Sequence, residues 1–312
     1  MGVYRLLAPP KVIAAMRKNE TSCTDVHKQA KLGATDEPIQ AQLWEDNLLA
    51  ADRKPSGPTN SEKPSSAISR KNIQDTLFNE GLLAAKASVS VNTLLELQEA
   101  LTKQLGQNSM ETRVRYARSI LRWFFPDGLN GLARRVWVAY GDESIETDIL
   151  RYLYLAAEPV MGACVAEALF PLENGMQIST QYFDQFLNSF LGEPPPEKTR
   201  KRLKSNLMKL GFLHRARGKP DRLTTVMPAK TSLLILLHHL FSQQGTRTVE
   251  LRRLLADPFW KFLGYKSEDA VRAVLREANA VGILGKYVVA DQLEQVTTSM
   301  SADEFLTRKV HL

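Results

Sequence analysis

The chain has 312 residues, of which 44% are hydrophobic and 24% are charged, as is usual for globular proteins and unlike disordered or membrane chains. A single hydrophobic core rarely grows beyond about 250 to 300 residues, so the length predicts more than one domain. The two cysteines, Cys23 and Cys164, lie far apart, which argues against a disulfide framework and against a cysteine metal site. The first residues lack the unbroken apolar core of a secretory signal, and we expect a cytoplasmic protein without a membrane partner.

Residues 1–90 are expected to form an N-terminal helical region with one long interruption. Helical patterns occur at residues 12–17 and 39–51, whereas residues 52–70 hold three prolines among serines. Proline and serine at that density favour a flexible loop or linker. A further helical pattern at residues 72–87 closes this region.

Residues 91–176 are expected to form a helical middle domain. The pattern at residues 91–105 begins with Asn92 or Thr93, either of which can cap a helix, and repeats leucine at helical spacing. A second helix is expected at residues 111–125. The rest of this domain is rich in alanine, leucine and valine, which predicts buried helices.

Residues 177–230 are expected to form a winged helix-turn-helix module. Ser179 or Thr180 can cap a first helix, and a second helix at residues 199–210 ends before Gly211, because glycine favours helix C-termini. Helix, turn, helix and then a hairpin is the element order of a winged helix-turn-helix. Two β-prone runs would form the wing. The first begins at Phe212, and the second covers residues 223–227.

The same element order occurs a second time, at residues 231–312. Gly282 lies 71 residues after Gly211, and at this offset apolar residues fall opposite apolar residues. A second hairpin is expected near residues 287–296. We therefore predict a mainly α, multi-helix protein with at least two winged helix-turn-helix modules and small β-hairpin wings. The matched apolar pairs are Leu203 and Val274, Leu207 and Ala278, Leu210 and Val281, Phe212 and Ile283, and Leu213 and Leu284.

A weaker echo lies upstream, at an offset of 87 residues. Helix periodicity alone produces such matches by chance, so this echo predicts no module. It places Thr112, Arg113 and Arg115 opposite Thr199, Arg200 and Arg202.

The positive charge of the chain is concentrated in residues 198–222. This segment holds ten basic residues and one acidic residue, a net charge of +9, whereas the whole chain carries +7. Like charges at this density repel one another within a helix. The uninterrupted basic run therefore indicates an anionic partner, for which the phosphates of a nucleic acid are suited.

In a winged helix-turn-helix, the second helix can enter the major groove while the hairpin approaches the backbone. A solvated face and docking on an acidic protein remain alternatives. A second basic patch can bind phosphate or can pair with the acidic residues Asp142, Glu143, Glu146 and Asp148. This patch consists of Arg113, Arg115, Arg118 and Arg122, followed by Arg134 and Arg135. The candidate nucleic-acid contacts are Lys198, Arg200, Lys201, Arg202 and Lys204 on the helix, Arg215, Arg217 and Lys219 at the hairpin tip, and Arg113, Arg115 and Arg118 in the second patch.

No residue pattern indicates catalysis. The sequence has no phosphate-binding glycine loop and no histidine pair at metal spacing, so we expect no cofactor. His238 and His239 are adjacent, which points their side chains about 100° apart on a helix; a core or boundary role is expected. The acidic group at Asp142 can bind a divalent ion, although capping of a helix is more usual.

The order of three segments resembles BrxA, the small protein of the BREX bacteriophage-exclusion systems. Those segments are residues 111–124 (ETRVRYARSILRWF), 178–187 (ISTQYFDQFL) and 197–213 (EKTRKRLKSNLMKLGFL). The resemblance implies a largely helical protein that binds DNA in phage defence, together with other defence proteins. It implies Thr199, Arg200, Arg202 and Lys204 as DNA contacts. The chain departs from the family by its C-terminal repeat and by residues 52–70.

Our hypothesis is a non-enzymatic DNA-binding accessory protein of a phage-defence system, which grips double-stranded DNA by its backbone. RNA is the other possible ligand. One alternative is a transcriptional regulator or plasmid replication initiator, which reads base edges. Another is an assembly scaffold that docks its basic helix on an acidic protein.

Overall fold

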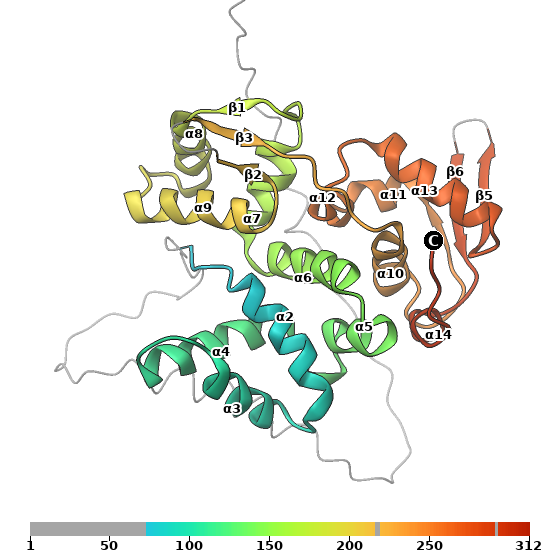
Figure 1. The fold of residues 1–312 in the computed structure, drawn as a ribbon. Coiled ribbons are helices and arrows are strands. Elements are labelled where there is room, and N and C mark those ends of the chain that lie inside the picture. Colours follow the sequence, from blue (N-terminus) through green and yellow to red (C-terminus); the bar gives the residue numbers. More distant parts are fainter. Residues whose placement is uncertain (1–72, 216–218, 291–292) are drawn as a thin grey trace, which may run out of the picture. The chain divides into compact units, whose positions relative to one another are not determined.

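The structure, a computed structural model, describes residues 73–215, 219–290 and 293–312 (Figure 1). These residues are mainly helical and include two small antiparallel three-stranded sheets, which confirms the prediction of a mainly α protein. The helical patterns predicted at residues 12–17 and 39–51, and the loop predicted at residues 52–70, lie outside the described residues.

The helices that precede the repeats start at the caps that the sequence offers. Thr93 caps its helix by accepting a hydrogen bond from the Glu96 N–H at 3.2 Å, so Thr93 and not Asn92 is the cap. Asp142 accepts from the N–H groups of Ser144 and Ile145, which confirms its role as a helix cap. The helices are α2 (Phe78–Ala87), α3 (Leu94–Gln104), α4 (Met110–Phe124), α5 (Leu132–Tyr140) and α6 (Glu143–Ala157), with short 3-10 turns η2 (Ser88–Ser90) and η3 (Gly128–Asn130).

The prediction that a helix begins at residue 72 is wrong, because α2 begins at Phe78. Leu77 has a left-handed backbone, with φ of 48°, which an α-helix does not accommodate. The preceding residues are held from outside by Asn206, whose side chain accepts from the Thr76 N–H and donates to the Gln74 carbonyl. A tertiary contact therefore overrides the helical pattern of this segment.

Two sets of elements follow one another with the same order and the same sheet topology. Each set runs helix, strand, helix, helix, strand, strand, and in each sheet the last strand of the set pairs with both others. The first set is α7 (Pro159–Ala163) continued by the π-helical turn η4 (Cys164–Leu169), β1 (Gln177–Ile178), α8 (Thr180–Leu191), α9 (Glu197–Lys209), β2 (Leu213–His214) and β3 (Asp221–Leu223). The second is α10 (Lys230–Phe241), β4 (Thr248–Glu250), α11 (Leu251–Ala256) with α12 (Phe259–Leu263), α13 (Glu268–Ala280), β5 (Leu284–Ala290) and β6 (Leu293–Thr298), followed by α14 (Ala302–Thr307).

The offset of 71 residues holds at the level of single hydrogen bonds. α13 begins and ends 71 residues after α9. The helices stop at Gly211 and Gly282, whose φ angles are 86° and 77°, so the predicted glycine stops are confirmed. After each glycine the chain returns an N–H to its helix, from Phe212 to the Leu207 carbonyl and from Ile283 to the Ala278 carbonyl, both at 2.9 Å. The internal repeat is therefore structural as well as sequential.

The hairpins differ from the prediction in two respects. Each sheet has a third strand, β1 or β4, that the sequence pattern did not reveal. The run predicted at residues 223–227 is mostly wrong, because only Leu223 belongs to β3. Val226 instead packs on Gly264, where an added Cβ would lie 2.5 Å from the Val226 Cβ. The chain therefore leaves the sheet after Leu223, and Val226 packs on Gly264 instead of extending the strand.

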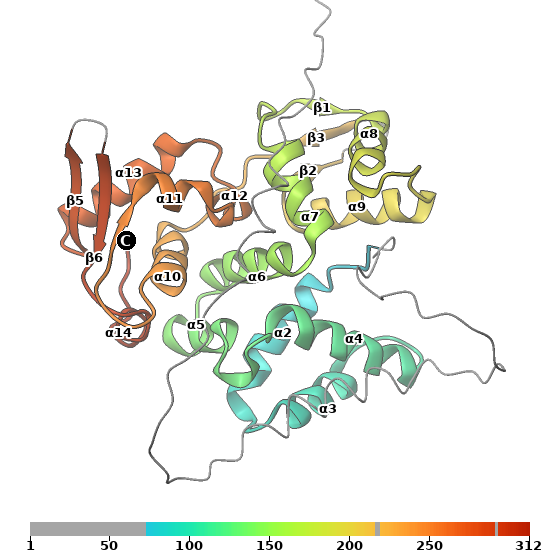
Figure 2. The same cartoon turned by 180° about the vertical axis from the view of Figure 1, so that it is seen from behind.

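α6 is buried among elements from the whole described unit. It contacts α2, α4 and α5 as well as α10 and α12 (Figures 1 and 2). α10 is buried along most of its length. Among the described residues, no single helix is long and apolar enough to cross a membrane, although the bent pair of α6 with Pro159–Leu169, which turns by 109°, passes that test together.

Candidate nucleic-acid interface

α9 separates its apolar and basic residues onto different faces. Leu203 and Leu207 are buried in the core, whereas Lys198, Lys201 and Ser205 are exposed. These spacings of three and four residues place the exposed side chains on one face of the helix. Thr199 is only 2% exposed and lies on the core side, so it does not contribute to this exposed face.

Most of the basic side chains of α9 already hold a carboxylate. Arg200 Nη1 donates to both oxygens of Asp184, at 2.9 and 2.8 Å. Lys201 pairs with Glu197 at 2.7 Å, one turn earlier on the same helix. Such internal pairs reduce the positive field that the sequence alone predicts.

Asp221 fastens the hairpin to α9. Its buried carboxylate accepts from Lys204 Nζ at 2.6 Å and from Arg215 Nε and Nη2 at 2.5 and 3.0 Å. Burial raises the pKa of Asp221, but the ion pairs with Arg215 and Lys204 outweigh burial and keep the pKa below its usual value. Lys204 is thereby directed toward the hairpin, and its side chain is 14% exposed. Both cations position the hairpin as well as adding charge.

Four cations of this region have no carboxylate partner among the described residues, namely Lys198 and Arg202 on α9 and Lys219 and Arg222 on the hairpin. Arg202 is half-buried and the other three are exposed. Arg217 lies outside the described residues. These four side chains are the part of the basic segment that is available for an external anion.

Arg222 was not among the sequence candidates. It lies on the middle strand, opposite Gln177 on one neighbour and His214 on the other, and all three are exposed. In β3, Asp221 and Leu223 point inward and Arg222 points outward, as side chains alternate along a strand. That alternation is the sequence signal that could have identified Arg222.

The second basic patch lies on α4. Arg115 and Arg118 are exposed, and Arg113 is half-buried with a buried Nε that has no hydrogen-bond partner. The predicted alternative, that acidic residues following α5 neutralise this patch, is wrong. Asp142 caps α6, Glu143 contacts Lys86, Asp148 pairs with Arg151, and Glu146 is buried without a partner.

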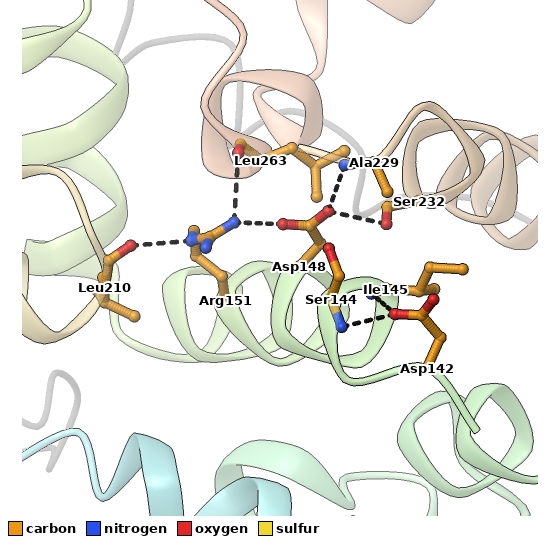
Figure 3. A network of polar contacts seen from close by, with 9 residues as sticks. All are labelled: Asp142, Ser144, Ile145, Asp148, Arg151, Leu210, Ala229, Ser232 and Leu263. Carbon is orange, nitrogen blue, oxygen red and sulfur yellow. Dashed lines mark hydrogen bonds and ion pairs between the residues drawn. The ribbon is translucent and has the colours of Figure 1, made fainter. Parts of the chain in front are cut away.

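Asp148 and Arg151 instead join α6 to both repeats (Figure 3). Arg151 Nη1 donates to Asp148 at 2.6 Å, and its guanidinium also donates to the carbonyls of Leu210, after α9, and Leu263, at the end of α12. The second oxygen of Asp148 accepts from the Ala229 N–H and the Ser232 hydroxyl at the start of α10. Burial raises the pKa of Asp148, and these partners oppose that rise. The network fixes the position of α6 against both repeats.

The helix of the second repeat is more nearly neutral. Arg272 of α13 contacts Glu294 at 3.0 Å, Glu268 at 3.1 Å and Asp269 at 3.3 Å. Its positive charge is therefore surrounded by carboxylates. Residues 267–280 hold the acidic residues Glu268, Asp269 and Glu277 beside Arg272 and Arg276.

The histidines and the described cysteine occupy core positions. His238 is fully buried and stacks on Phe305, with ring centroids 4.3 Å apart, and burial lowers its pKa. Cys164 is buried, which raises the pKa of its thiol. Within the part of the chain that the structure describes, no three His, Cys, Asp or Glu side chains gather as a metal site would require.

No family model matches the sequence, and no curated protein matches it. Two solved structures are similar to the fold, both named SspB. The structure titled "SspB crystal structure" has a TM-score of 0.38 and 13% identity, over 54% of this chain and 59% of that one. The "Magnesium ion-bound SspB crystal structure" has a TM-score of 0.43 and 12% identity, over 79% of this chain and 87% of that one. Both similarities are too weak to assign this chain a function.

Proposed function

We propose that this chain is a non-enzymatic DNA-binding protein of the cytoplasm, whose first repeat is a winged helix-turn-helix. α9 would be the helix that approaches the DNA, and the β2–β3 hairpin would be its wing. The second repeat would be a winged helix with a supporting role. Binding would rest mainly on ion pairs to the phosphate backbone of a duplex, with little reading of base edges.

The observation that carries this proposal is the contrast in charge between two helices in equivalent positions. The element order supports the winged-helix assignment of both repeats. α9 has two cations without a carboxylate partner among the described residues, Lys198 and Arg202, whereas α13 has one, Arg276, which lies over the Tyr287 ring at 5.9 Å. The wing adds Lys219 and Arg222 from a different element. A convergence of basic side chains from a helix and its hairpin fits a phosphate backbone.

The biological setting is proposed from the sequence resemblance alone. Similarity to BrxA suggests an accessory protein of a bacteriophage-defence system, acting with other proteins of that system. Deleting the gene from its host should then raise the plating efficiency of a sensitive phage by at least tenfold. If the plating efficiency is unchanged in a strain whose defence is active, the proposed role in phage defence is contradicted, but the proposed DNA binding is not.

A second candidate function is a scaffold that docks on an acidic protein. The pairing of Arg200, Lys201 and Lys204 with internal carboxylates favours it, because less charge remains for a long polyanion. Failure of the protein to bind any duplex or single strand at about 50 mM salt would support the scaffold, since phosphate contacts are strong at low salt.

The experiment is a fluorescence anisotropy titration of a labelled random duplex at several salt concentrations. If the four cations each contact one phosphate, log K should fall against log salt with a slope of about −3.6. The variant Lys198→Ala/Arg202→Ala should reduce the steepness by about 2. Arg252→Ala/Arg253→Ala is the matched control, because these two arginines of α11 are exposed and have no ion pair among the described residues.

Competition with unlabelled DNA distinguishes binding to the phosphate backbone from recognition of a specific operator sequence. A protein that recognises an operator should bind its specific site more tightly than random duplex by a factor on the order of 10³ or more. A protein that binds only the phosphate backbone should show no such difference in affinity. Equal slopes and affinities for wild type and Lys198→Ala/Arg202→Ala, with both proteins folded, would contradict the proposal.

A further inference from the structure

Two helices from different parts of the chain, α4 and α9, meet at one residue, Gln74. The Ser119 hydroxyl of α4 donates to the Gln74 side-chain oxygen at 3.2 Å. The Asn206 side chain of α9 donates to the Gln74 backbone carbonyl at 2.7 Å. Because both contacts end on a single residue, the two helices lie within the reach of one glutamine.

Each of these helices places cations around its contact with Gln74 in the same way. On α4, Arg115 and Arg122 lie four residues before and three residues after Ser119. On α9, Arg202 and Lys209 lie four before and three after Asn206. Residues at these spacings share one face of a helix. Both helices therefore direct basic side chains toward the same segment.

The correspondence extends beyond these residues. α9 begins 87 residues after α4, and α8 ends 87 residues after α3. The weak sequence echo at this offset, which chance could have produced, thus coincides with two helix pairs of the same order and similar length. α3 with α4 and α8 with α9 are equivalent pairs whose second helices both contact Gln74.

The surface around Gln74 keeps a net basic character. Asp75 pairs with Lys209 at 2.5 Å, and Arg122 contacts Glu158 at 3.4 Å. Arg115 and Arg118 on α4 have no ion pair within the described ranges, as is also true of Lys198 and Arg202 on α9. A shallow hollow of about 510 Å³ beside Asp75 is lined by Glu197, Lys198, Lys201, Arg202 and Ser205.

We propose that α4 and α9 form one composite surface that binds the backbone of a single DNA duplex. Arg115 and Arg118 would contact phosphates beyond those that Lys198 and Arg202 reach. A helix with its side chains is about 10 to 12 Å across, and the major groove is about 12 Å wide. Neighbouring helices can therefore reach phosphates along one duplex, whereas two duplexes side by side would repel each other.

This inference rests on the proposed function and predicts how the two patches combine. The test uses the full chain and a labelled duplex of about 20 base pairs, with the variants Arg115→Ala/Arg118→Ala and Lys198→Ala/Arg202→Ala, their fourfold combination, and Arg252→Ala/Arg253→Ala as control. Each pair should flatten the salt slope by about 2, and the fourfold variant by about 4. Binding at saturation should be one duplex per protein in wild type and in both pair variants.

Three results would contradict a proposal, and they are distinguishable. A wild-type slope for Arg115→Ala/Arg118→Ala, beside a reduced slope for Lys198→Ala/Arg202→Ala, would overturn the composite surface and leave the proposed function standing. Two duplexes bound per wild-type protein would also overturn it. Absence of binding by wild type at about 50 mM salt would overturn the proposed function itself. Circular dichroism of each variant confirms that the fold is retained.

Discussion

The two repeats follow the same path but carry different charges. Two buried positions correspond and are apolar in both helices, Leu203 with Val274 and Leu207 with Ala278. The predicted match of Leu210 with Val281 is wrong as a core pair, because Val281 is 61% exposed. The exposed positions of the two helices have diverged: Lys198 of α9 corresponds to Asp269 of α13, and Arg202 corresponds to Ala273. The comparison indicates that the shared core residues specify this fold, whereas the exposed residues are free to diverge.

The hairpins diverge in the same direction. The first hairpin is short and places Lys219 and Arg222 on the surface, whereas the second is longer. In the second sheet the position of Arg222 is taken by Thr297, which lies opposite Thr248 as Arg222 lies opposite Gln177. The difference in charge therefore covers both the helix and the hairpin of each repeat, which supports a distinct role for each repeat.

The largest expected effect concerns the network that joins the repeats to α6. Arg151→Met removes the donor to Leu210 and Leu263 and leaves the buried carboxylate of Asp148 without its cation. Breaking a buried ion pair in this way costs about 3 to 5 kcal/mol. Urea unfolding followed by circular dichroism should show this loss. Arg151→Met/Asp148→Leu should recover part of it, and a double variant no more stable than Arg151→Met would contradict this account.

Asp221→Asn tests what holds the first hairpin to α9. Losing charged hydrogen bonds to Lys204 and Arg215 should cost about 1.5 to 3 kcal/mol. The released cations should increase the affinity for DNA severalfold. Because the folded-state pKa of Asp221 is lowered, its stabilisation is complete above the usual aspartate pKa and is lost as the pH falls through the lowered value. A difference between the urea midpoints of wild type and Asp221→Asn that does not shrink as the pH falls below the usual aspartate pKa would contradict this assignment.

Glu146→Gln tests a buried carboxyl on α6 that belongs to neither repeat. Neither oxygen of Glu146 has a partner, and burial raises its pKa well above the usual value. Wild type should therefore lose stability as the pH rises from the usual glutamate pKa through the raised one. The neutral amide should remove this loss and stabilise the protein by about 1 kcal/mol at neutral pH. Parallel stability curves for the two proteins would be the contrary result.

Substitution of the two glycines that end α9 and α13 tests whether the repeats are equivalent in structure. Gly211→Ala and Gly282→Ala each place a side chain at positive φ, which costs about 1 to 2 kcal/mol. An added Cβ has room at both sites, so the two costs should agree within about 0.5 kcal/mol. A thermal melt of each variant measures them, and a much larger loss at one site would show that the stops differ.

Much of the local structure could be predicted from the sequence. The caps at Thr93 and Ser179 and the stop at Gly211 depend on residues close in the chain, and the repeat follows from the spacing of apolar residues. Positions that depend on distant partners could not be predicted. Leu77 adopts positive φ beside residues held by Asn206, and Val226 leaves the strand to pack on Gly264.

The candidate site was predictable in location and less so in detail. A concentration of charge can be counted along a sequence, but the pairing of Arg200 with Asp184 or of Lys204 with Asp221 depends on how helices and strands meet. Arg222 was missed because the predicted β-prone run began at residue 223, whereas β3 covers Asp221–Leu223. The meeting of α4 and α9 at Gln74 likewise follows only from tertiary structure.

The most direct test of the central claim replaces two residues of α9 with the residues found at the same positions of α13. Lys198→Asp/Arg202→Ala gives α9 the residues that α13 carries at the same positions, and both sites are at the surface of the helix. Anisotropy with a random duplex at about 0.1 M salt should show at least tenfold weaker binding and a salt slope flatter by about 2 or more, with the thermal midpoint unchanged. Binding and slope equal to those of wild type, in a folded variant, would contradict the claim that α9 grips DNA.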